Sequence, residues 1–206
     1  ILARQGSRLS QLRLRRGASR LDDAQLAELQ QSHGLVSATA NPDAGGKDNS
    51  DFLASINDGI GLSVNLHADG PDGIIGWRAR KHAGLIDIDK PASQPISRFW
   101  EAVRTDDLTG GGLVLNPDEF YILASREFVC VPSSYAAEMR AYDTRVGEFR
   151  AHYAGFFDPG FGMSDIGAAP TRAVLEVRSH DVPFLIEHGQ IVCRLVYEPM
   201  ADVPEA

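Results

Sequence analysis

The chain has 206 residues, a formal net charge of -8 and 43% hydrophobic residues. This length suits one large domain or a domain with an appendage, and the apolar fraction is sufficient for a folded core. The acidic balance argues against nucleic acid and anionic membranes as partners, because both attract clustered cations. The sequence has no apolar run approaching about 18 residues and no charged-then-apolar leader, so we expect neither a membrane span nor secretion.

The two cysteines, Cys130 and Cys193, lie far apart, and neither has a Cys or His at metal-ligand spacing. The sequence therefore indicates neither a disulfide framework nor a structural zinc site. We expect two buried free thiols and a cytoplasmic protein. The chain begins with Ile1 and not with Met, which predicts a fragment or a processed product.

The first 20 residues are unusually basic for this chain. Arg8 to Arg20, "RLSQLRLRRGASR", carries five arginines alternating with leucines, which predicts an amphipathic strand with a solvated basic edge. Further along, Ser37 to Asp51 is polar and rich in small residues. That composition predicts a loop or linker.

Between these two segments lies a helix signal, Asp22 to His33. Asp22 suits the N-cap, Gln25 completes a capping box, and Gly34 suits the C-cap. We expect the leucines of this segment, Leu26 and Leu29, to share one buried face.

From Gly61 onward, short β-like runs recur between Gly, Pro and Asp residues. Runs of this length at regular spacing predict an all-β barrel or sandwich with a few short helices. The runs begin at Gly61, Ile74, Gly84, Gly112, Glu119, Glu127, Glu148, Thr171, Val182 and Gln190. One segment, Ser97 to Arg104, predicts a short helix capped by Ser97, with Trp100 in the core.

The run Thr171 to Ser179, "TRAVLEVRS", carries the first candidate for chemistry. Strand alternation places Ala173, Leu175 and Val177 on one face, and Val174, Glu176 and Arg178 on the other. A desolvated Glu176 would have a raised pKa suited to a general base. Alternatively, Glu176 is a surface residue paired with Arg178 or with a cross-strand arginine.

Two neighbouring segments could bind a ligand. Glu138 to Arg150 contains three arginines, whose guanidinium groups suit phosphate oxygens, although surface ion pairs are the alternative. His152 to Gly162, "HYAGFFDPGFG", combines turn residues with aromatic rings. This pattern is typical either of a floor for a small planar ligand or of an ordinary hairpin. The sequence lacks the His-x-Glu and Pro-Cys-x-x-Cys segments of zinc-dependent base deaminases.

The order of the pieces, an arginine-rich segment, "HYAGFFDPGFG", "VLEV" and "GQIVCRLVYE", resembles the deoxycytidine triphosphate (dCTP) deaminase branch of the trimeric dUTPase-like superfamily. The resemblance covers roughly Gly110 to Met200, and it implies a dUTPase-like distorted barrel, or β-clip. It is nearest to the duplicated form, in which two β domains follow one another. Gln5 to Arg15 also shares the layout of His188 to Glu198. We therefore expect residues 1–20 to be the terminal strand of a preceding domain, 21–58 a helix and linker, and 59–206 the dUTPase-like domain.

The resemblance implies a metal-independent hydrolysis of dCTP to deoxyuridine triphosphate (dUTP) and ammonia. Magnesium would arrive on the nucleotide's phosphates and would not be catalytic. The family's sites lie at subunit interfaces, so a homo-oligomer is expected. Carried over by motif, the implied catalytic residues are Glu176 as base, Arg145 and the carbonyl of Ala154, and the implied substrate-binding residues are Arg140, Phe157, Asp158, Gly160 and Gln190.

One departure from the family pattern is marked. Two serines are expected after Arg140, whereas this chain has Ala141 and Tyr142. Two alternatives follow from the resemblance: a dUTP diphosphatase-type hydrolase on the same fold, or a non-catalytic half of a duplicated enzyme that binds nucleotide or completes an assembly.

Overall fold

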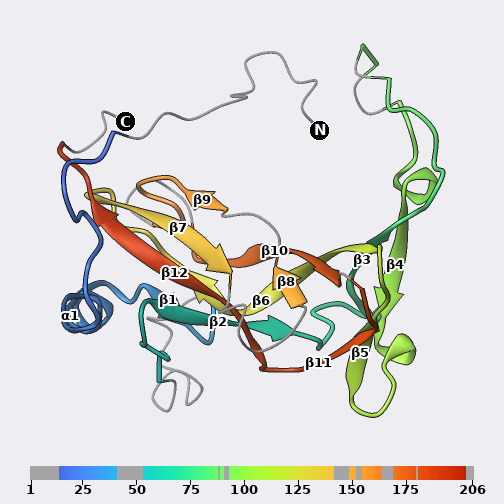
Figure 1. The fold of residues 1–206 in the computed structure, drawn as a ribbon, viewed down its shortest axis with the longest axis horizontal. Coiled ribbons are helices and arrows are strands. Elements are labelled where there is room, and N and C mark those ends of the chain that lie inside the picture. The colour runs from blue at the N-terminus through green and yellow to red at the C-terminus, as the bar shows by residue number, and fades with distance from the viewer. Residues whose placement is uncertain are drawn as a thin grey trace.

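The structure is a computed structural model that describes residues 14–40, 53–87, 89–90, 93–141, 149–151, 155–163, 169–179 and 181–202 (Figure 1). Its elements are mostly strands, so the all-β expectation is confirmed. They are α1 (Asp23–His33), β1 (Val36–Ser37), β2 (Ile60–Asn65), β3 (Ile74–Ala79), η2 (Ile96–Arg98), β4 (Trp100–Arg104), η3 (Thr105–Asp107), β5 (Gly112–Leu115), β6 (Phe120–Val129), β7 (Tyr135–Ala141), β8 (Phe149–Ala151), β9 (Phe156–Phe157), β10 (Thr171–Ser179), β11 (Phe184–Glu187) and β12 (Ile191–Pro199), where η marks a 3-10 helix. None of the described helices is long and apolar enough to cross a membrane.

Strand β6 lies at the centre of the fold. Among the described residues, ten strands form one curled sheet along the order β4-β3-β6-β2-β12-β7-β9, while β1 and β10 also pair with β6, and β8 pairs with β10. Strands β5 and β11 form a separate two-stranded sheet. The sequence predicts two runs here, beginning at Glu119 and Glu127. The structure joins them into one strand because the exposed Arg126 continues the alternation of inward and outward side chains.

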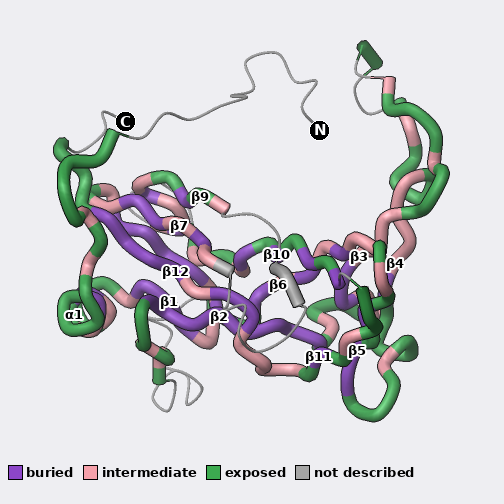
Figure 2. The backbone as a smooth tube through the Cα atoms, viewed as in Figure 1, coloured by how far each residue is buried: buried purple, intermediate pink, exposed green. Residues whose placement is uncertain are grey.

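The core fills the inside of the curled sheet. Inward-facing residues of β2, β6, β7, β10 and β12 belong to one hydrophobic cluster, drawn as buried tube in Figure 2. Leu62, Leu123, Met139, Leu175 and Leu195 represent these strands, and each is at most 5% exposed. Both cysteines are free and buried, as predicted. One face of each of these strands thus lies in the core, and β2 is buried on both faces, whereas the outer face of β10 is exposed.

Helix α1 confirms its predicted caps. The Asp22 carboxylate accepts a hydrogen bond from the Gln25 amide at 2.9 Å, and the Gln25 side chain accepts one from the Asp22 amide at 3.0 Å. Gly34 closes the helix with a φ of 60°, a left-handed conformation that glycine adopts without strain. Leu26 and Leu29 are buried, which docks the helix on the barrel.

The predicted helix over Ser97 to Arg104 is wrong. Its start forms the 3-10 turn η2, and the rest is strand β4, which pairs with β3 so that Trp77 lies opposite Ala102. Trp100 is half-buried beside Phe120, with ring centroids 6.0 Å apart, so it is not a core residue. The cross-strand pairing with β3 outweighs the local helix signal.

Three further segments differ from expectation. The run from Gly84 forms no strand in its described residues, which belong to the exposed ribbon beyond β3 and β4 (Figure 2). Tyr135–Ala141 is a strand that the sequence reading treats only as the edge of an arginine cluster. In the basic N-terminal segment, residues 14–20 form no strand, and residues 1–13 lie outside the described residues.

Candidate functional site

Glu176 projects from the outer face of β10. Its neighbours Leu175 and Val177 are fully buried, while Glu176 is exposed, so the predicted alternation is confirmed. Within the described part of the chain, the Glu176 carboxylate makes no hydrogen bond or ion pair. Neither sequence interpretation is met within one chain, because the carboxylate is not desolvated and is not paired with an arginine.

A row of side chains crosses the sheet at the level of Glu176. Glu176 pairs with Ile122 of β6, and Ile122 pairs in turn with Trp77 of β3. Directly opposed residues of neighbouring antiparallel strands share a face, with Cβ atoms roughly 5 Å apart. The outer face therefore places an apolar and an aromatic side chain beside the carboxylate. Sequence reasoning missed Trp77, because only the register of β3 and β6 brings it into this row.

The turn after Gly155 docks its backbone on the segment that follows β6. Gly160 donates its amide hydrogen to the Val131 carbonyl at 2.9 Å, and the Val131 amide donates to the Phe161 carbonyl at 2.7 Å. Gly162 has a φ of 71°, and a Cβ there would lie 2.4 Å from the Val129 carbonyl oxygen. Only glycine permits this approach.

The aromatic rings of the turn are divided between core and surface. Phe157 is 8% exposed and packs edge-to-face with Phe161, with centroids 5.0 Å apart. Phe156 is 49% exposed and offers the accessible ring. Asp158 is also exposed. Its backbone carbonyl closes the turn by accepting a hydrogen bond from the Phe161 amide at 3.1 Å. Of the three rings expected to form a planar floor, Phe156, Phe157 and Phe161, Phe157 is thus mainly a core contact, and Phe156 is the ring that remains accessible.

Gln190 holds the turn between β11 and β12. Its side-chain oxygen accepts a hydrogen bond from the Glu187 amide at 3.0 Å, and its carbonyl accepts one from the Val64 amide at 3.0 Å. The side-chain oxygen of Gln190 thus stabilises the turn by its bond to Glu187. The side-chain NH2 group is the part of Gln190 that remains for a ligand.

Arg140 lies on the outer face of β7, directly opposite Arg194 of β12. The neighbouring pair, Met139 and Leu195, belongs to the core, which places both arginines on the other side of the sheet. Arg140 forms an ion pair with Asp58 at 3.5 Å. Two guanidinium groups on one face of the sheet present several hydrogen-bond donors to an anion. Sequence reasoning missed Arg194, because its opposition to Arg140 depends on long-range strand pairing.

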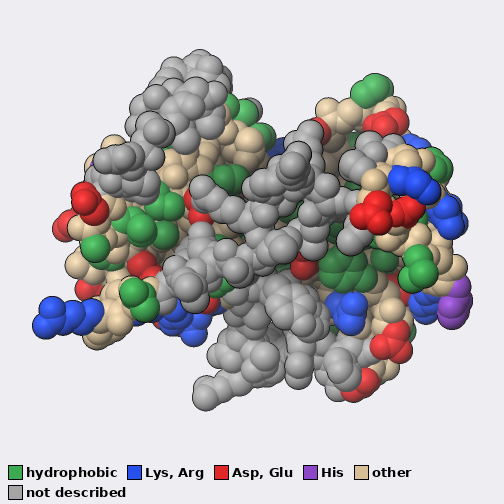
Figure 3. Space-filling view, turned by 90° about the horizontal axis from the view of Figure 1, so that it is seen from above, with side chains coloured by type: hydrophobic (Ala, Val, Ile, Leu, Met, Phe, Trp, Pro, Cys, Tyr) green, Lys and Arg blue, Asp and Glu red, His purple; other side chains and the backbone are tan. Residues whose placement is uncertain are grey.

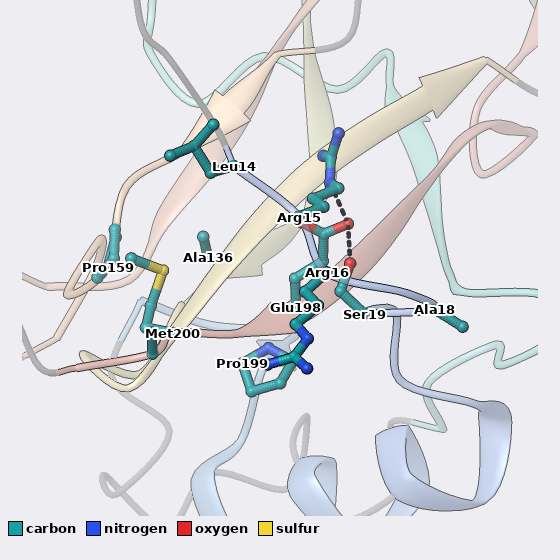
Figure 4. A pocket seen from close by; sticks show the side chains of 11 residues that line it. Leu14, Arg15, Arg16, Ala18, Ser19, Ala136, Pro159, Glu198, Pro199 and Met200 are labelled. Carbon is teal, nitrogen blue, oxygen red and sulfur yellow. Dashed lines mark hydrogen bonds and ion pairs between the residues drawn. The ribbon is translucent and has the colours of Figure 1, made fainter.

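A pocket of about 600 Å³ lies further along the same outer face, between residues 14–19 and the turn at Pro159 (Figure 4). Its lining consists of Leu14, Arg15, Arg16, Ala18, Ser19, Ala136, Pro159, Glu198, Pro199, Met200 and Ala201. The volume lies within the range of small-molecule sites, which is roughly 300–1,000 Å³.

Two of the charged residues that line this pocket, Arg15 and Glu198, bind each other, and Arg15 also binds Glu138. The Nε of Arg15 donates to Glu198 at 2.8 Å, its terminal nitrogen donates to Glu138 at 2.8 Å, and the Ser19 hydroxyl donates to Glu198 at 3.3 Å. Hydrogen bonding to Glu198 raises the pKa of the Arg15 guanidinium above its ordinary value. We conclude that Glu198 is a structural anchor for the N-terminal segment and is not available as a base.

The structure does not gather the candidate residues into one place within the chain. Glu176 lies on β10 and Arg140 on β7, and β6, β2 and β12 separate these strands in the sheet. Two other candidates, Arg145 and Ala154, lie outside the described residues. Among the described residues, no group of three or more His, Cys, Asp or Glu side chains is placed to hold a metal ion.

One face of the molecule carries side chains of several kinds. In the view from above, acidic, basic and hydrophobic side chains of the described residues lie interspersed (Figure 3). Val174, on the outer face of β10 near Glu176, is 62% exposed.

The comparisons with known proteins agree with one another. A family model described as the C-terminal domain of 2'-deoxycytidine 5'-triphosphate deaminase matches residues 22–206. A crystal structure of 2'-deoxycytidine 5'-triphosphate deaminase from Agrobacterium tumefaciens is 46% identical, with a TM-score of 0.76, and the match covers 92% of this chain and 51% of that chain. A curated relative from Methanobrevibacter smithii, "dCTP deaminase, dUMP-forming", is 30% identical over 121 residues, which are 57% of each chain. The chain thus spans about half the length of these two proteins.

Proposed function

The chain belongs to the family of the C-terminal domain of 2'-deoxycytidine 5'-triphosphate deaminases, and from this premise we propose that it takes part in the hydrolysis of dCTP to dUTP and ammonia. The observation that carries the proposal is a combination of two features. Arg140 and Arg194 lie opposite each other on one outer face, and Glu176 is exposed on another. The arginines can bind the phosphates of a nucleotide, and the carboxylate can act as the general base for attack by water on the pyrimidine ring.

Glu176 is the base in this proposal. Its carboxylate takes a proton from a water molecule that attacks the pyrimidine carbon bearing the amino group. Glu176 passes this proton to the ring nitrogen, the second proton of the water is relayed to the amino group, and the bond between the carbon and that amino group breaks, so that water and dCTP give dUTP and ammonia. The row of Ile122 and Trp77 supplies apolar surface beside this carboxylate. By the family resemblance, the Ala154 carbonyl orients the attacking water and the amino group, and Arg145 is a further catalytic residue.

Arg140 and Arg194 hold the phosphates. Guanidinium groups bind phosphate oxygens through paired hydrogen bonds, and two of them at one register present several donors to one anion. Asp58 neutralises part of this charge before the substrate arrives. Magnesium, if bound, comes with the triphosphate.

A homo-oligomer completes the site. Glu176 is exposed, and a carboxylate in free contact with water is a weak base at neutral pH. Covering the outer face of β10 by a second copy would desolvate it and bring it to the phosphate-binding face of that copy. The free buried thiols are compatible with a reducing compartment, and we place the protein in the cytoplasm.

The experiment that tests the proposal is ammonia release from dCTP by Glu176→Gln. We expect turnover to fall by about a thousandfold while dCTP affinity stays within a few-fold, because the amide keeps the shape and loses the base. Glu28→Gln, on the exposed surface of α1, is the matched control and should retain full activity. Retained turnover in Glu176→Gln would exclude the assigned base.

A second function is favoured by one relative. The protein from Methanobrevibacter smithii is named a dUMP-forming enzyme, so deamination there is combined with loss of pyrophosphate. Product analysis separates the cases for this chain: dUTP with ammonia indicates a deaminase, dUMP with ammonia and pyrophosphate a combined enzyme, and dUMP from dUTP alone a diphosphatase. Nucleotide binding without any product would support the non-catalytic alternative, to which Ala141 and Tyr142 point.

A further inference from the structure

Two histidines stack where the end of β2 meets the turn between β11 and β12. The rings of His67 and His188 are nearly parallel, with centroids 3.7 Å apart and an interplanar angle of 9°. The amide of Leu66 donates a hydrogen bond to the Nδ1 atom of His188 at 3.1 Å. Neither ring belongs to the proposed deamination site.

The hydrogen bond fixes the protonation state of His188. A ring nitrogen that accepts a hydrogen bond carries no proton, so His188 is neutral, with its proton on Nε2. A second proton would have to enter at Nδ1 and break the bond to Leu66.

Two arginines surround this pair. Arg126 projects from the outer face of β6, with its Nη1 atom 4.0 Å from the position that a Cβ of Gly189 would take. Arg172 lies at the beginning of β10 and forms a double ion pair with Asp69, with both distances 3.0 Å. Burial lowers the pKa of His188, and the charges of His67, Arg126 and Arg172 lower it further.

The acidic side chains at this place do not pair with Arg126. Asp69 is engaged by Arg172, and Glu127, the residue next to Arg126, points inward and accepts hydrogen bonds from Ser63. Within the described residues, the Arg126 guanidinium makes no hydrogen bond or ion pair. The chain has a net charge of -8, so a guanidinium group without an ion-pair partner is unusual in it. An anion bound beside the two histidine rings would neutralise the charge of Arg126.

We propose that Arg126, His67 and His188 form a second anion site, separate from Arg140 and Arg194, that binds phosphate groups. Arg126 supplies the permanent charge and a planar set of donors. The Nε2–H of His188 supplies a neutral donor, and the stacked ring of His67 supplies a further ring N–H donor. The chemistry suits the phosphates of a nucleotide and inorganic polyphosphate alike.

The test follows the imidazole signals of the full chain by NMR at constant ionic strength and pH 6.5. The probes are inorganic tripolyphosphate, dCTP and deoxycytidine, which has no phosphate. We expect tripolyphosphate, dCTP or both to shift the signals of His67 and His188, while deoxycytidine leaves them unchanged. A response to dCTP alone assigns the phosphate to a nucleotide, and a response to tripolyphosphate alone assigns it to a free anion.

Arg126→Gln removes the permanent charge and should weaken the response roughly tenfold, as expected for loss of a charge-assisted hydrogen bond. Arg98→Gln is the matched control, because Arg98 is exposed on the ribbon beyond β4 and binds only Gln94 and the Phe99 ring among the described residues. Equal weakening by both substitutions, equal shifts from deoxycytidine and dCTP, or unchanged ring signals with all probes would each overturn the proposal. The readout is binding at named rings, so it does not depend on whether the chain deaminates dCTP.

Discussion

The outer faces of two strand groups in this protein differ in how their charges are held. On β7 and β12, the carboxylates of Glu138 and Glu198 are both bound by Arg15, and Arg140 is bound by Asp58. On β10, Glu176 stands exposed without a described partner. A carboxylate already bound by an arginine of its own chain contributes to folding and position, whereas an exposed carboxylate without such a bond is available for a reaction or a second subunit.

This difference separates binding from chemistry. The β7 and β12 face carries two opposed arginines and suits a phosphate group, while the β10 face carries the only proposed base. If the division is real, substitutions on the two faces should change different quantities.

The largest effect expected on the binding face comes from removing both of its opposed arginines. Arg140→Gln with Arg194→Gln should raise the KM for dCTP about a hundredfold and change kcat by no more than a few-fold, because charge-assisted contacts to phosphate are lost uniformly. Steady-state kinetics of ammonia release measure both constants. The matched substitution on the other face is Arg178→Gln. If it raised the KM equally, the division between the faces would fail.

A smaller effect is expected when a glutamate on each face is replaced by glutamine and the free energy of unfolding is measured. Glu198→Gln should lower the free energy of unfolding by about 1–2 kcal/mol, because the buried side chain loses charged bonds from Arg15. Glu176→Gln should change it by less than about 0.5 kcal/mol, since Glu176 has no described bond to lose. Urea denaturation measures both values. Equal losses would show that the β10 carboxylate is also part of the folded framework.

The smallest effect concerns pH and should arise on neither face. His188 has a lowered pKa, so the unfolded chain binds its proton more readily than the folded chain does. The stability contributed by His188 is complete above the ordinary His pKa of about 6.5 and is lost as the pH falls below that value. Denaturation midpoints at pH 7.5 and 5.5 should therefore show a loss on acidification. His188→Asn keeps an acceptor for the Leu66 amide and should reduce this loss, whereas an unchanged loss would place the titrating group elsewhere.

Local patterns in the sequence predict some elements well. The caps of α1 involve Asp22, Gln25 and Gly34, which lie within 12 residues of one another. The ends of the helix are therefore set by residues close together in the sequence. The alternation of β10 is equally local, because successive side chains must point to opposite faces. Prediction is poorer where strand pairing determines the secondary structure. The segment after Ser97 has a local helix signal, yet Trp100–Arg104 forms strand β4 because it pairs with β3.

The sequence by itself determined the β class, the helix with its caps, the glycine turn near Gly160, and which face of β10 carries Glu176. Each of these depends on the conformational preferences of residues close together in the chain. Only the tertiary structure decided that Arg194 lies opposite Arg140, that Trp77 shares a row with Glu176, and that His67 stacks on His188. These contacts join residues from 54 to 121 positions apart, as their numbers show. Their register is set by which apolar faces meet in the common core, and no local pattern contains that information.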